Sequence, residues 1–385
     1  MNNKDVRLLY LTTVPWGWIK QRPHFIAEKM SNYHSVDVFC KVPLKLSQKD
    51  LLTEIPHDNR QLTINHFFIF PFERIPVLKH LNLNFINRLF LWYYIKKTKK
   101  YDVIWFASPI LYSFMKNRIL KTQTVVYDCM DDMAEFGNNA ENSKERQLIL
   151  KTERDLLTRA DVVFCSAEYL KTKILSRAGL INKKATVVNN AIEMPQDDKE
   201  LEIPPHVSII LETSKSYNNN LLYIGTISEW FDFESVLYAL DKDSKLHVTL
   251  IGPSQVMIPK HPRLFHLGTV ERKYLFEFMK YAKALIMPFV VNELIRSVNP
   301  VKLYEYVYSG KPVVASRYGE TEKFSDFVQL YSNKQEFFDI ISNLDNIPTD
   351  ETYKSKCKAF VSMNTWDERC KNMNMELMSV LNSKS

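Results

Sequence analysis

The chain alternates short apolar runs with longer stretches of helical character, and this alternation occurs twice along its 385 residues. The apolar runs are mostly continuous stretches of Val, Ile, Leu and Phe. Such runs are typical of strands that are buried on both faces of a parallel sheet. In the first half, strands are predicted at residues 6–13, 36–42, 65–70, 103–107, 124–128, 162–166 and 186–189, with helices between them that include 23–31 and 145–159.

Residues 195–220 interrupt the alternation with prolines, a DDKE run and an Asn-rich stretch, which together are typical of a connection between domains. The alternation then restarts. Strands are predicted at 221–224, 246–251, 264–267, 284–287, 312–315 and 328–331, and helices at 233–240, 272–281, 300–309, 334–342 and about 365–381. This order predicts an α/β protein with two parallel sheets. Its expected parts are an N-terminal Rossmann-like domain (1–195), a connection (196–220), a second Rossmann-like domain (221–363) and a C-terminal helix (364–385).

Composition narrows the class of protein. A hydrophobic content of 45% and a charged content of 25% are ordinary for a globular chain. No uncharged apolar run reaches the roughly 18 residues of a membrane span, and the first apolar stretch is too short for a signal peptide. Five scattered cysteines without a C-x-x-C pair or a Cys/His cluster favour a reducing compartment and no zinc site. We therefore expect a cytoplasmic protein.

One helix start in the second half carries the strongest functional pattern. A helix is expected to begin with Asn299 as N-cap and Pro300 at its first position. A helix N-terminus offers free N–H groups and partial positive charge, which suit a phosphate. Lys302 adds a full charge, and Glu305 shares its face and can accept hydrogen bonds from ribose hydroxyls. The alternative is a plain amphipathic helix with an exposed Lys–Glu pair.

The same segment, NPVKLYEYVYSGKPVVAS (299–316), resembles the donor-site signature of GT-B glycosyltransferases close to family 4. YLTTVPWGWIKQRPHFIAEKM (10–30) resembles the first strand, loop and helix of bacterial cell-wall and polysaccharide enzymes of that group, including teichuronic-acid-type enzymes. Further likeness lies, in the same order, in VVYDCMDDMAEF, ADVVFCSAEYL, LLYIGTISEWFDFESVLYAL and HLGTVERKYLFEFMKYAKALIMPF. The resemblance thus extends over nearly the whole chain.

The resemblance implies the GT-B fold, with two Rossmann-like domains facing across a cleft and a C-terminal helix that returns to the N-domain. It implies transfer of a sugar, with retention and without a metal or other cofactor, from a nucleotide-sugar (a UDP-sugar first) to a cell-envelope or polysaccharide acceptor. The donor-site residues that it implies are Gly225 and Thr226 at the diphosphate, Lys302 at the phosphates, Glu305 at the ribose, Leu267 to Val270 at the base, and Asn299 and Pro300 at the helix start.

The chain departs from the family pattern at two places. Many family members carry Glu where this chain has Ser297, which is kept as a candidate donor contact, and they usually carry basic residues where this chain reads ISEWFDF. Arg272, Lys273 and Arg296 are candidates to supply the missing charge. The missing Glu keeps open a non-catalytic GT-B subunit that supports another transferase. A second alternative is a sugar-nucleotide epimerase on the same two-domain fold.

The N-terminal half supplies the candidate acceptor residues. The loop VPWGWIKQRPH follows the first strand, so Arg22 and His24 lie at a helix N-terminus, with Trp16 or Trp18 as a sugar platform. The alternative is a tryptophan-packed loop with a solvated arginine. Asp131 and Asp132, like Asp128, follow another strand and can orient acceptor hydroxyls or act as a general base; the alternative is helix capping and solvation. Ser108 follows the fourth strand. His24, Asp131 and Asp132 are the catalytic candidates, and Trp16, Trp18, Arg22 and Ser108 are the acceptor-binding ones.

Part of the net charge of +7 is concentrated in residues 66–101, where seven Lys and Arg stand against one acid among many aromatic and aliphatic residues. A helix of this kind can lie on an anionic membrane, and the acceptor would then be lipid-linked. The alternative is a helix packed on the sheet with a lysine-rich exposed end. No known nucleic-acid-binding module is present, so no such partner is expected. Asp241 and Asp243 spell D-x-D, but they lie where a helix meets a turn and predict no metal site.

Overall fold

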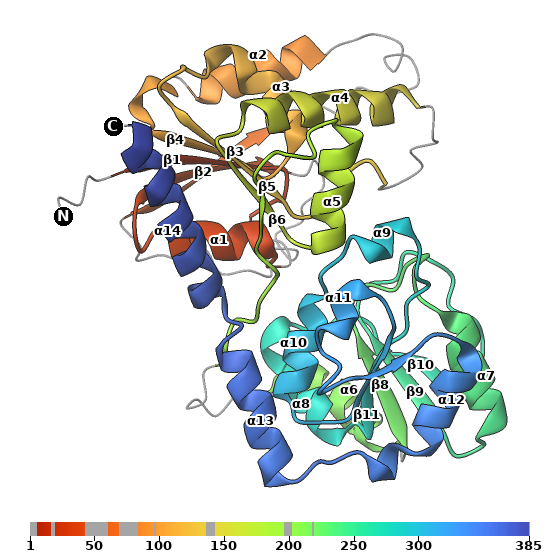
Figure 1. Cartoon of the computed structure of the whole chain (residues 1–385). Helices are drawn as coiled ribbons and strands as arrows, with labels where there is room; N and C mark the ends of the chain where they lie inside the picture. The colour runs from red at the N-terminus through yellow and green to blue at the C-terminus, as the bar shows by residue number, and fades with distance from the viewer. Residues whose placement is uncertain are drawn as a thin grey trace. The chain divides into compact units, whose positions relative to one another are not determined.

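The computed structural model describes residues 6–16, 20–42, 61–68, 84–95, 98–135, 143–195, 202–217 and 219–384. The chain forms two compact units (Figure 1). Unit 1 comprises Met1–Asn189 and Trp366–Ser385, and unit 2 comprises Asn190–Thr365. The first boundary therefore lies before the predicted connection at 196–220, and the second lies two residues after the predicted start of the C-terminal segment.

Unit 1 is built on a parallel sheet with the strand order β3-β2-β1-β4-β5-β6-β7 within its described residues. Each strand predicted in this half of the sequence overlaps one of them. The strands are β1 (Arg7–Thr12), β2 (Ser35–Val42), β3 (Leu62–Phe68), β4 (Val103–Phe106), β5 (Thr124–Cys129), β6 (Val162–Cys165) and β7 (Thr186–Val187).

Helices cover both faces of this sheet, as Figure 1 shows. Helix α3 packs between α2 and α4, while α1 and α14 pack against each other. The bounds are α1 (Arg22–Met30), α2 (Asn84–Tyr94), α3 (Pro109–Met115), α4 (Lys144–Arg159), α5 (Glu168–Arg177) and α14 (Trp366–Lys384), with short 3-10 turns η3 (Thr98–Lys100) and η4 (Lys116–Arg118).

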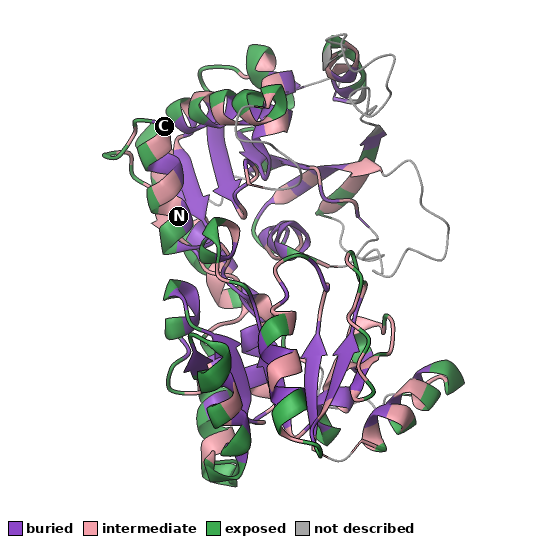
Figure 2. Cartoon of the chain, turned by 90° about the vertical axis from the view of Figure 1, so that its right-hand side faces the viewer, coloured by how far each residue is buried: buried purple, intermediate pink, exposed green. Residues whose placement is uncertain are grey.

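Two cores explain why the strands of unit 1 are apolar without alternation. Leu9, Leu11 and Ile104 belong to the core under α2, α3, α4 and α5. On neighbouring strands the rings of Tyr10 and Trp105 stack 5.7 Å apart, and Tyr10 follows Leu9 in the chain, so it points to the opposite face. Because both faces are covered, every residue of β4 and β5 is buried, as is every residue of β1 after Arg7, and Figure 2 shows buried residues along most strands of both sheets.

Unit 2 repeats the architecture with the parallel strand order β10-β9-β8-β11-β12-β13 in its described part. Its strands also overlap those predicted. They are β8 (Asn220–Ile224), β9 (His247–Ile251), β10 (Leu264–His266), β11 (Ala284–Met287), β12 (Val313–Ser316) and β13 (Gln329–Tyr331). The helices are α6 (Pro205–Lys215), α7 (Phe233–Lys242), α8 (Leu275–Tyr281), α9 (Glu293–Arg296), α10 (Val301–Tyr308), α11 (Gly319–Glu322), α12 (Lys334–Ser342) and α13 (Glu351–Ser362), with 3-10 turns η5 (Arg272–Tyr274) and η6 (Leu344–Asn346).

Helix α6 corrects the expectation that residues 196–220 are an irregular connection. The two prolines that interrupt the pattern begin the helix, with Pro204 as N-cap and Pro205 at the first position. Proline suits this place because its missing N–H would have no partner in the first turn. Val207 and Leu211, four residues apart, are buried in the core of unit 2. Helix α6 is thus part of unit 2.

The C-terminal helix α14 is anchored in unit 1 by its first residue. The Trp366 ring is fully buried and stacks on Phe25 of α1 with 4.9 Å between ring centroids. Further along, Asn374 Oδ1 lies 2.6 Å from His34 Nε2. Helix α14 therefore covers α1, and α1 carries the residues after β1 that the sequence singled out.

We expect Trp366→Ala to lower the free energy of unfolding of unit 1 by about 3–5 kcal/mol, because it removes a buried indole and leaves a cavity. Urea denaturation followed by circular dichroism measures this change. The matched control is Met375→Ala on the same helix, whose side chain is largely exposed, and it should change the stability by no more than about 0.5 kcal/mol. Equal stability of the two variants would contradict the anchoring role of Trp366.

Candidate donor and acceptor sites

The end of β8 in unit 2 is shaped by a contact between Gly225 and Lys302. Gly225 has a φ of +150°, where residues with a Cβ are strained. A Cβ at this position would lie 1.9 Å from Lys302 Cε and 2.6 Å from its Nζ. The lysine side chain therefore occupies the space that any other residue at position 225 would fill. Its ammonium group also lies 5.8 Å from the centroid of the Tyr223 ring.

The charge of Lys302 has no directly paired carboxylate among the residues that the structure describes. Its Nζ makes no hydrogen bond or ion pair with any residue that the structure describes. Burial lowers the pKa of Lys302, and the nearby Glu305 opposes this shift only in part. Lys302 is half-buried, and an ammonium group with reduced hydration and no carboxylate partner among the described residues is stabilised by an approaching anion. The end of β8 therefore favours an anionic ligand.

Two further glycines bring neighbouring strand ends close to Gly225. A Cβ on Gly252, which follows β9 at a φ of +141°, would lie 2.1 Å from the carbonyl oxygen of Gly225. The Gly252 N–H donates to the Gly268 carbonyl oxygen at 2.7 Å. Three consecutive strand ends thus meet with no side chain between them. Gly252 was not among the predicted site residues, and Gly268 was included only in the range 267–270 predicted at the base, although a glycine directly or soon after each strand was a visible signal.

Helix α10 begins one residue later than predicted, which corrects the assignment of Asn299 as N-cap. Pro300 is the N-cap residue, and no side chain caps the helix. The Asn299 Oδ1 instead accepts a hydrogen bond from Asn190 N at 2.9 Å, and its Nδ2 donates to Glu320 Oε2 at 2.7 Å. Asn299 therefore fixes the chain before the helix, and Lys302 stays in the first turn as expected.

Glu305 lies one turn further along α10 and is largely buried. Its Oε1 accepts a hydrogen bond from Arg272 Nη2 at 2.8 Å, while Arg272 Nη1 lies 3.8 Å from Glu193 Oε2. The second oxygen of Glu305 has no partner in the described part of the chain. One half of this carboxylate is thus held in place by Arg272, and the other half is available to a ligand.

The remaining predicted donor residues differ in what they offer. Thr226 contributes its carbonyl oxygen, which accepts from the Tyr223 hydroxyl at 2.7 Å. Leu267 and Val270 are half-buried against the core of unit 2 after β10. Arg296 is exposed on α9, without a hydrogen bond or ion pair among the described residues.

Ser297 corrects the expectation that it serves as a donor contact in place of the family's Glu. It is fully buried, and its hydroxyl donates to the Glu293 carbonyl oxygen at 3.0 Å. This local bond closes the last turn of α9. Its side chain is therefore committed to the backbone and is not presented to a ligand.

In unit 1, Arg22 is not the solvated or ligand-facing arginine that the sequence suggested. Its guanidinium donates to both carboxylate oxygens of Asp128, with a shortest distance of 2.8 Å, and to the Val188 carbonyl oxygen at 2.7 Å. Both side chains of the ion pair are buried. The pair links the start of α1 to the end of β5, so Arg22 has a structural role in this conformation.

His24 likewise has no ring nitrogen available for proton transfer in this conformation. Its Nδ1 accepts from the Gln21 N–H at 2.9 Å, and its Nε2 lies 3.0 Å from the Pro15 carbonyl oxygen, to which it can only donate. Burial also lowers the pKa of His24, which keeps the ring neutral. Trp16 packs edge-on against His24 at 4.7 Å and is buried, so it is not an open sugar platform. Trp18 lies outside the described residues.

The side chains of Asp132 and Ser108 also point into the interior of unit 1. The buried Asp132 carboxylate accepts from Arg177 at 2.7 Å and pairs with Lys173 at 3.1 Å. These contacts neutralise it, so a role as general base is not supported by its environment. The Ser108 hydroxyl is buried and lies 3.5 Å from Met133 Sδ, and the residue precedes α3 as N-cap.

Asp131 is the predicted acceptor residue that keeps a reactive group. It lies directly after the end of β5 and is half-buried, and its carboxylate has no partner within the described residues. Burial raises its pKa to about 6, helped by Asp128 and Asp132 and opposed by the cation of Arg22. A carboxylate with a raised pKa and accessible oxygens is suited to accept a hydrogen bond or a proton from a hydroxyl group.

The D-x-D sequence at the end of α7 has a local structural role. Asp243 accepts from the Lys245 N–H at 2.8 Å and from Asn219 Nδ2 at 3.3 Å. Among the described residues, no cluster of three or more His, Cys, Asp and Glu could hold a metal ion. The described helices include none that is long and apolar enough to cross a membrane.

Comparison with known proteins also indicates similarity to glycosyltransferases. Residues 26–194 match the model of Glycosyltransferase Family 4. The chain is 24% identical over 257 residues to TuaH of Bacillus subtilis (strain 168), whose name assigns it to teichuronic acid biosynthesis as a glycosyltransferase. That match covers 63% of this chain and 64% of the relative's length.

Solved structures share the fold over nearly the full chain. One is Anabaena Alr3699/HepE in complex with UDP and glucose, with a TM-score of 0.66, 14% identity and coverage of 97% of this chain and 99% of that one. Another is the trehalose-6-phosphate structure from E. coli bound with UDP-2-fluoro glucose, with a TM-score of 0.71, 12% identity and coverage of 96% and 98%. With its two parallel-sheet units and its likeness to these structures, the chain has the GT-B fold, and its residues 26–194 are similar to glycosyltransferase family 4.

Proposed function

We propose that the chain transfers a sugar from a UDP-sugar to a glycan or lipid-linked glycan of the cell envelope. The observation that carries the donor half is the unpaired ammonium group of Lys302 against Gly225. It lies at the ends of three strands, where parallel sheets bind ligands, and next to a helix start. A diphosphate matches this combination of charge and free backbone. The UDP found in related structures makes uridine the first choice of base.

The other donor residues take complementary roles in this proposal. The free oxygen of Glu305 accepts a hydrogen bond from the ribose, while Arg272 holds its second oxygen at 2.8 Å. The backbone at Gly225 and Thr226 approaches the diphosphate, and Leu267 and Val270 line the base. Arg272 supplies the positive charge that the segment after β8 lacks, and Arg296 is exposed within the same unit.

The chemistry proposed is retaining and needs no metal ion. Lys302, Arg272 and the start of α10 offset the negative charge that develops on the leaving diphosphate. The family likeness favours retention, in which a donor phosphate oxygen receives the acceptor proton on the same face of the sugar. The protein then orients the reactants and stabilises charge, without a side-chain nucleophile.

The acceptor half rests on Asp131. Its carboxylate follows β5 of unit 1 and has no partner in the described part of the chain, so it is free to orient a sugar hydroxyl. The teichuronic acid assignment of TuaH favours an envelope polysaccharide as the acceptor. We place the protein in the cytoplasm, at the inner face of the plasma membrane, with the membrane contact in residues 66–101.

We expect Lys302→Met to weaken UDP binding by about 10- to 150-fold, because a hydrogen bond to a charged group contributes about 1.5–3 kcal/mol. Methionine keeps the alkyl chain that packs on Gly225 and removes only the charge. Since burial lowers the pKa of Lys302, its charged form costs stability at neutral pH, and the variant should be at least as stable as the parent. Calorimetric titration with UDP and thermal unfolding measure both effects.

The matched control is Lys260→Met, at an exposed lysine of the same unit, which should bind UDP as the parent does. Glu305→Gln should weaken binding in the same way as the Lys302 variant. Transfer is measured as release of UDP that requires an added acceptor, which separates it from epimerisation. Full transfer activity in both site variants would refute the proposal. UDP binding without any transfer would instead favour the non-catalytic subunit, for which the inward-facing Ser297 is the structural argument.

Asp131 predicts a pH dependence. If its carboxylate must be ionised to orient the acceptor, kcat/KM should rise with pH and level off above its pKa of about 6. Asp131→Asn should remove this rise and lower the activity by about 10- to 150-fold, because a hydrogen bond to a charged group contributes about 1.5–3 kcal/mol. A rise that persists in the variant would assign it to another group.

The same shift has a consequence for stability. The folded pKa of Asp131 lies above its ordinary value of 3.8, so ionisation between these pH values costs stability as the pH rises. Asp131→Asn should therefore be more stable than the parent at neutral pH and equal to it below about pH 4, where both side chains are neutral. Thermal unfolding at the two pH values measures this. A difference that does not depend on pH would contradict the raised pKa.

A further inference from the structure

Helix α2 exposes an apolar stripe on the surface of unit 1. Phe85, Leu89 and Tyr93, each four residues from the next, are 50%, 53% and 65% exposed. Leu91 and Ile95 on the opposite side of the helix are buried in the core. Single exposed apolar residues are normal, but a stripe of large ones on one helix face is typical of a surface that contacts another apolar phase.

Two arginines border this stripe through one indole ring. The Trp92 ring, held by a hydrogen bond from its Nε1 to the Phe114 carbonyl oxygen at 2.9 Å, has the guanidinium of Arg88 at 5.2 Å and that of Arg118 at 4.5 Å. Neither arginine has a carboxylate partner among the described residues, and Arg88 Nε is buried without a hydrogen-bond acceptor. Two like charges gathered on one ring without a counter-ion favour an external anion.

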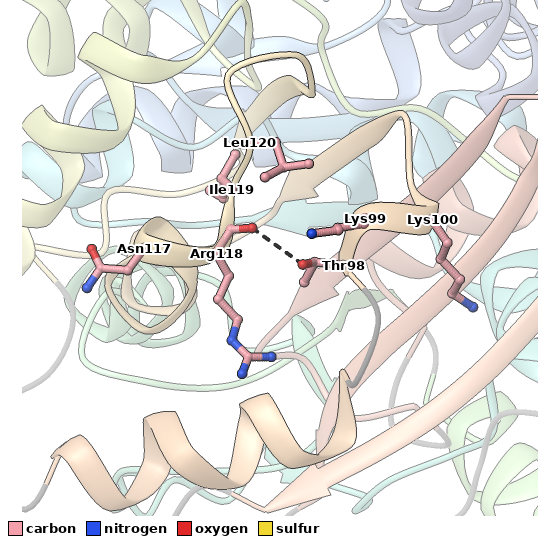
Figure 3. Close-up of a pocket in the computed structure, with 7 residues that line it drawn as sticks. All are labelled: Thr98, Lys99, Lys100, Asn117, Arg118, Ile119 and Leu120. Atoms are coloured by element: carbon pink, nitrogen blue, oxygen red, sulfur yellow. Dashed lines mark hydrogen bonds between the residues drawn. The ribbon is translucent and has the colours of Figure 1, made fainter.

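Next to this pair, a hollow of about 630 Å³ lies between η3 and the segment after α3. Residues 98–100 and 117–120 line it, and Lys99, which has no partner in the described part of the chain, extends across it toward the second segment (Figure 3). Lys100 points away in this view and pairs with Asp37 at 2.8 Å. Thr98 Oγ1 donates to the Arg118 carbonyl oxygen at 3.4 Å and connects the two walls. The hollow thus presents uncompensated positive charge and hydrogen-bond donors.

From these features we propose that the outer face of α2 and the hollow beside it form one docking site for an anionic lipid bilayer. Phe85, Leu89 and Tyr93 enter the boundary between headgroups and acyl chains, while Arg88, Lys99 and Arg118 bind lipid phosphates. The hollow is large enough to receive a phosphate-bearing headgroup. The site is the partner surface of the function proposed above and depends on it for its biological role, but vesicle binding is measured without donor or acceptor.

The test is co-sedimentation of the full chain with vesicles of phosphatidylcholine, with and without phosphatidylglycerol. We expect binding only to the anionic vesicles. The double variant Lys99→Glu with Arg118→Gln should weaken it by at least about 25-fold, because each cation near an anionic surface contributes about fivefold. Leu89→Gln should weaken it by about tenfold or more through the apolar contact. Lys356→Glu with Lys358→Gln, at exposed positions of α13, makes the same charge change in unit 2 and should bind as the parent does.

Lys99→Glu alone removes no contact of Trp92 with Arg88 or Arg118, and thermal unfolding of each variant checks that unit 1 stays folded. UDP titration checks unit 2. Binding of the double variant at the parent's level, or equal binding to neutral vesicles, would overturn the proposal. So would competition by inorganic phosphate alone without any dependence on Leu89, since the hollow would then hold a free anion. Lys302→Met should bind vesicles normally, so a failure of the donor proposal and a failure of the docking proposal are distinguishable.

Discussion

The close contact of Lys302 with Gly225 is the constraint on which the donor unit depends. An ammonium group can lie at the end of β8 only because no Cβ occupies that space, and position 225 adopts a φ that favours glycine. Gly252 is under the same constraint, because a Cβ at this position would lie 2.1 Å from the carbonyl oxygen of Gly225. Backbone without side chains and one half-buried cation are therefore concentrated at adjoining strand ends. The parallel sheet brings these strand ends together, and the glycines leave space beside the backbone. The proposed anion site therefore depends on the fold as much as on Lys302.

In unit 1, three residues of the same type differ in the partners of their carboxylates. Three aspartates lie at the end of β5 or just after it, within five positions, and each has a different environment. Asp128 is buried against Arg22, and Asp132 is buried against Arg177 and Lys173. Only Asp131 keeps its carboxylate without a partner among the described residues, and its two neighbours help to raise its pKa to about 6. The paired aspartates thus hold the loop and bias the third electrostatically, which is a division between support and chemistry.

Much of the fold could be predicted from the sequence because continuous apolar runs have few alternatives to buried parallel strands. The hydrogen-bond and ion-pair partners of side chains were harder to predict from the sequence. The assignment of Asn299 as N-cap followed a sound local rule, but the side chain bonds to Asn190, which is more than a hundred residues away in the chain. Arg22 looked exposed at a helix start for the same reason, because Asp128 is distant in sequence. Helix α6 was missed since its prolines also suit a break. The relative position of Lys302 and Glu305 could be predicted, because two residues three positions apart on one helix lie on the same face.

The serine at position 297 affects the charge and the polar contacts that unit 2 can offer to a ligand. Its hydroxyl is bonded to the backbone of α9, so it adds no charge to the donor unit. A glutamate at this position, as family members usually carry, would add a second carboxylate to a region where Glu305 alone opposes the charge of Lys302. Half of Glu305 is already engaged by Arg272. In the proposed donor site, this serine removes one acceptor for sugar hydroxyls, and the basic residues that the family carries after β8 are missing as well. Under the proposed function, discrimination among donor sugars therefore depends on fewer polar contacts than in enzymes that carry the glutamate.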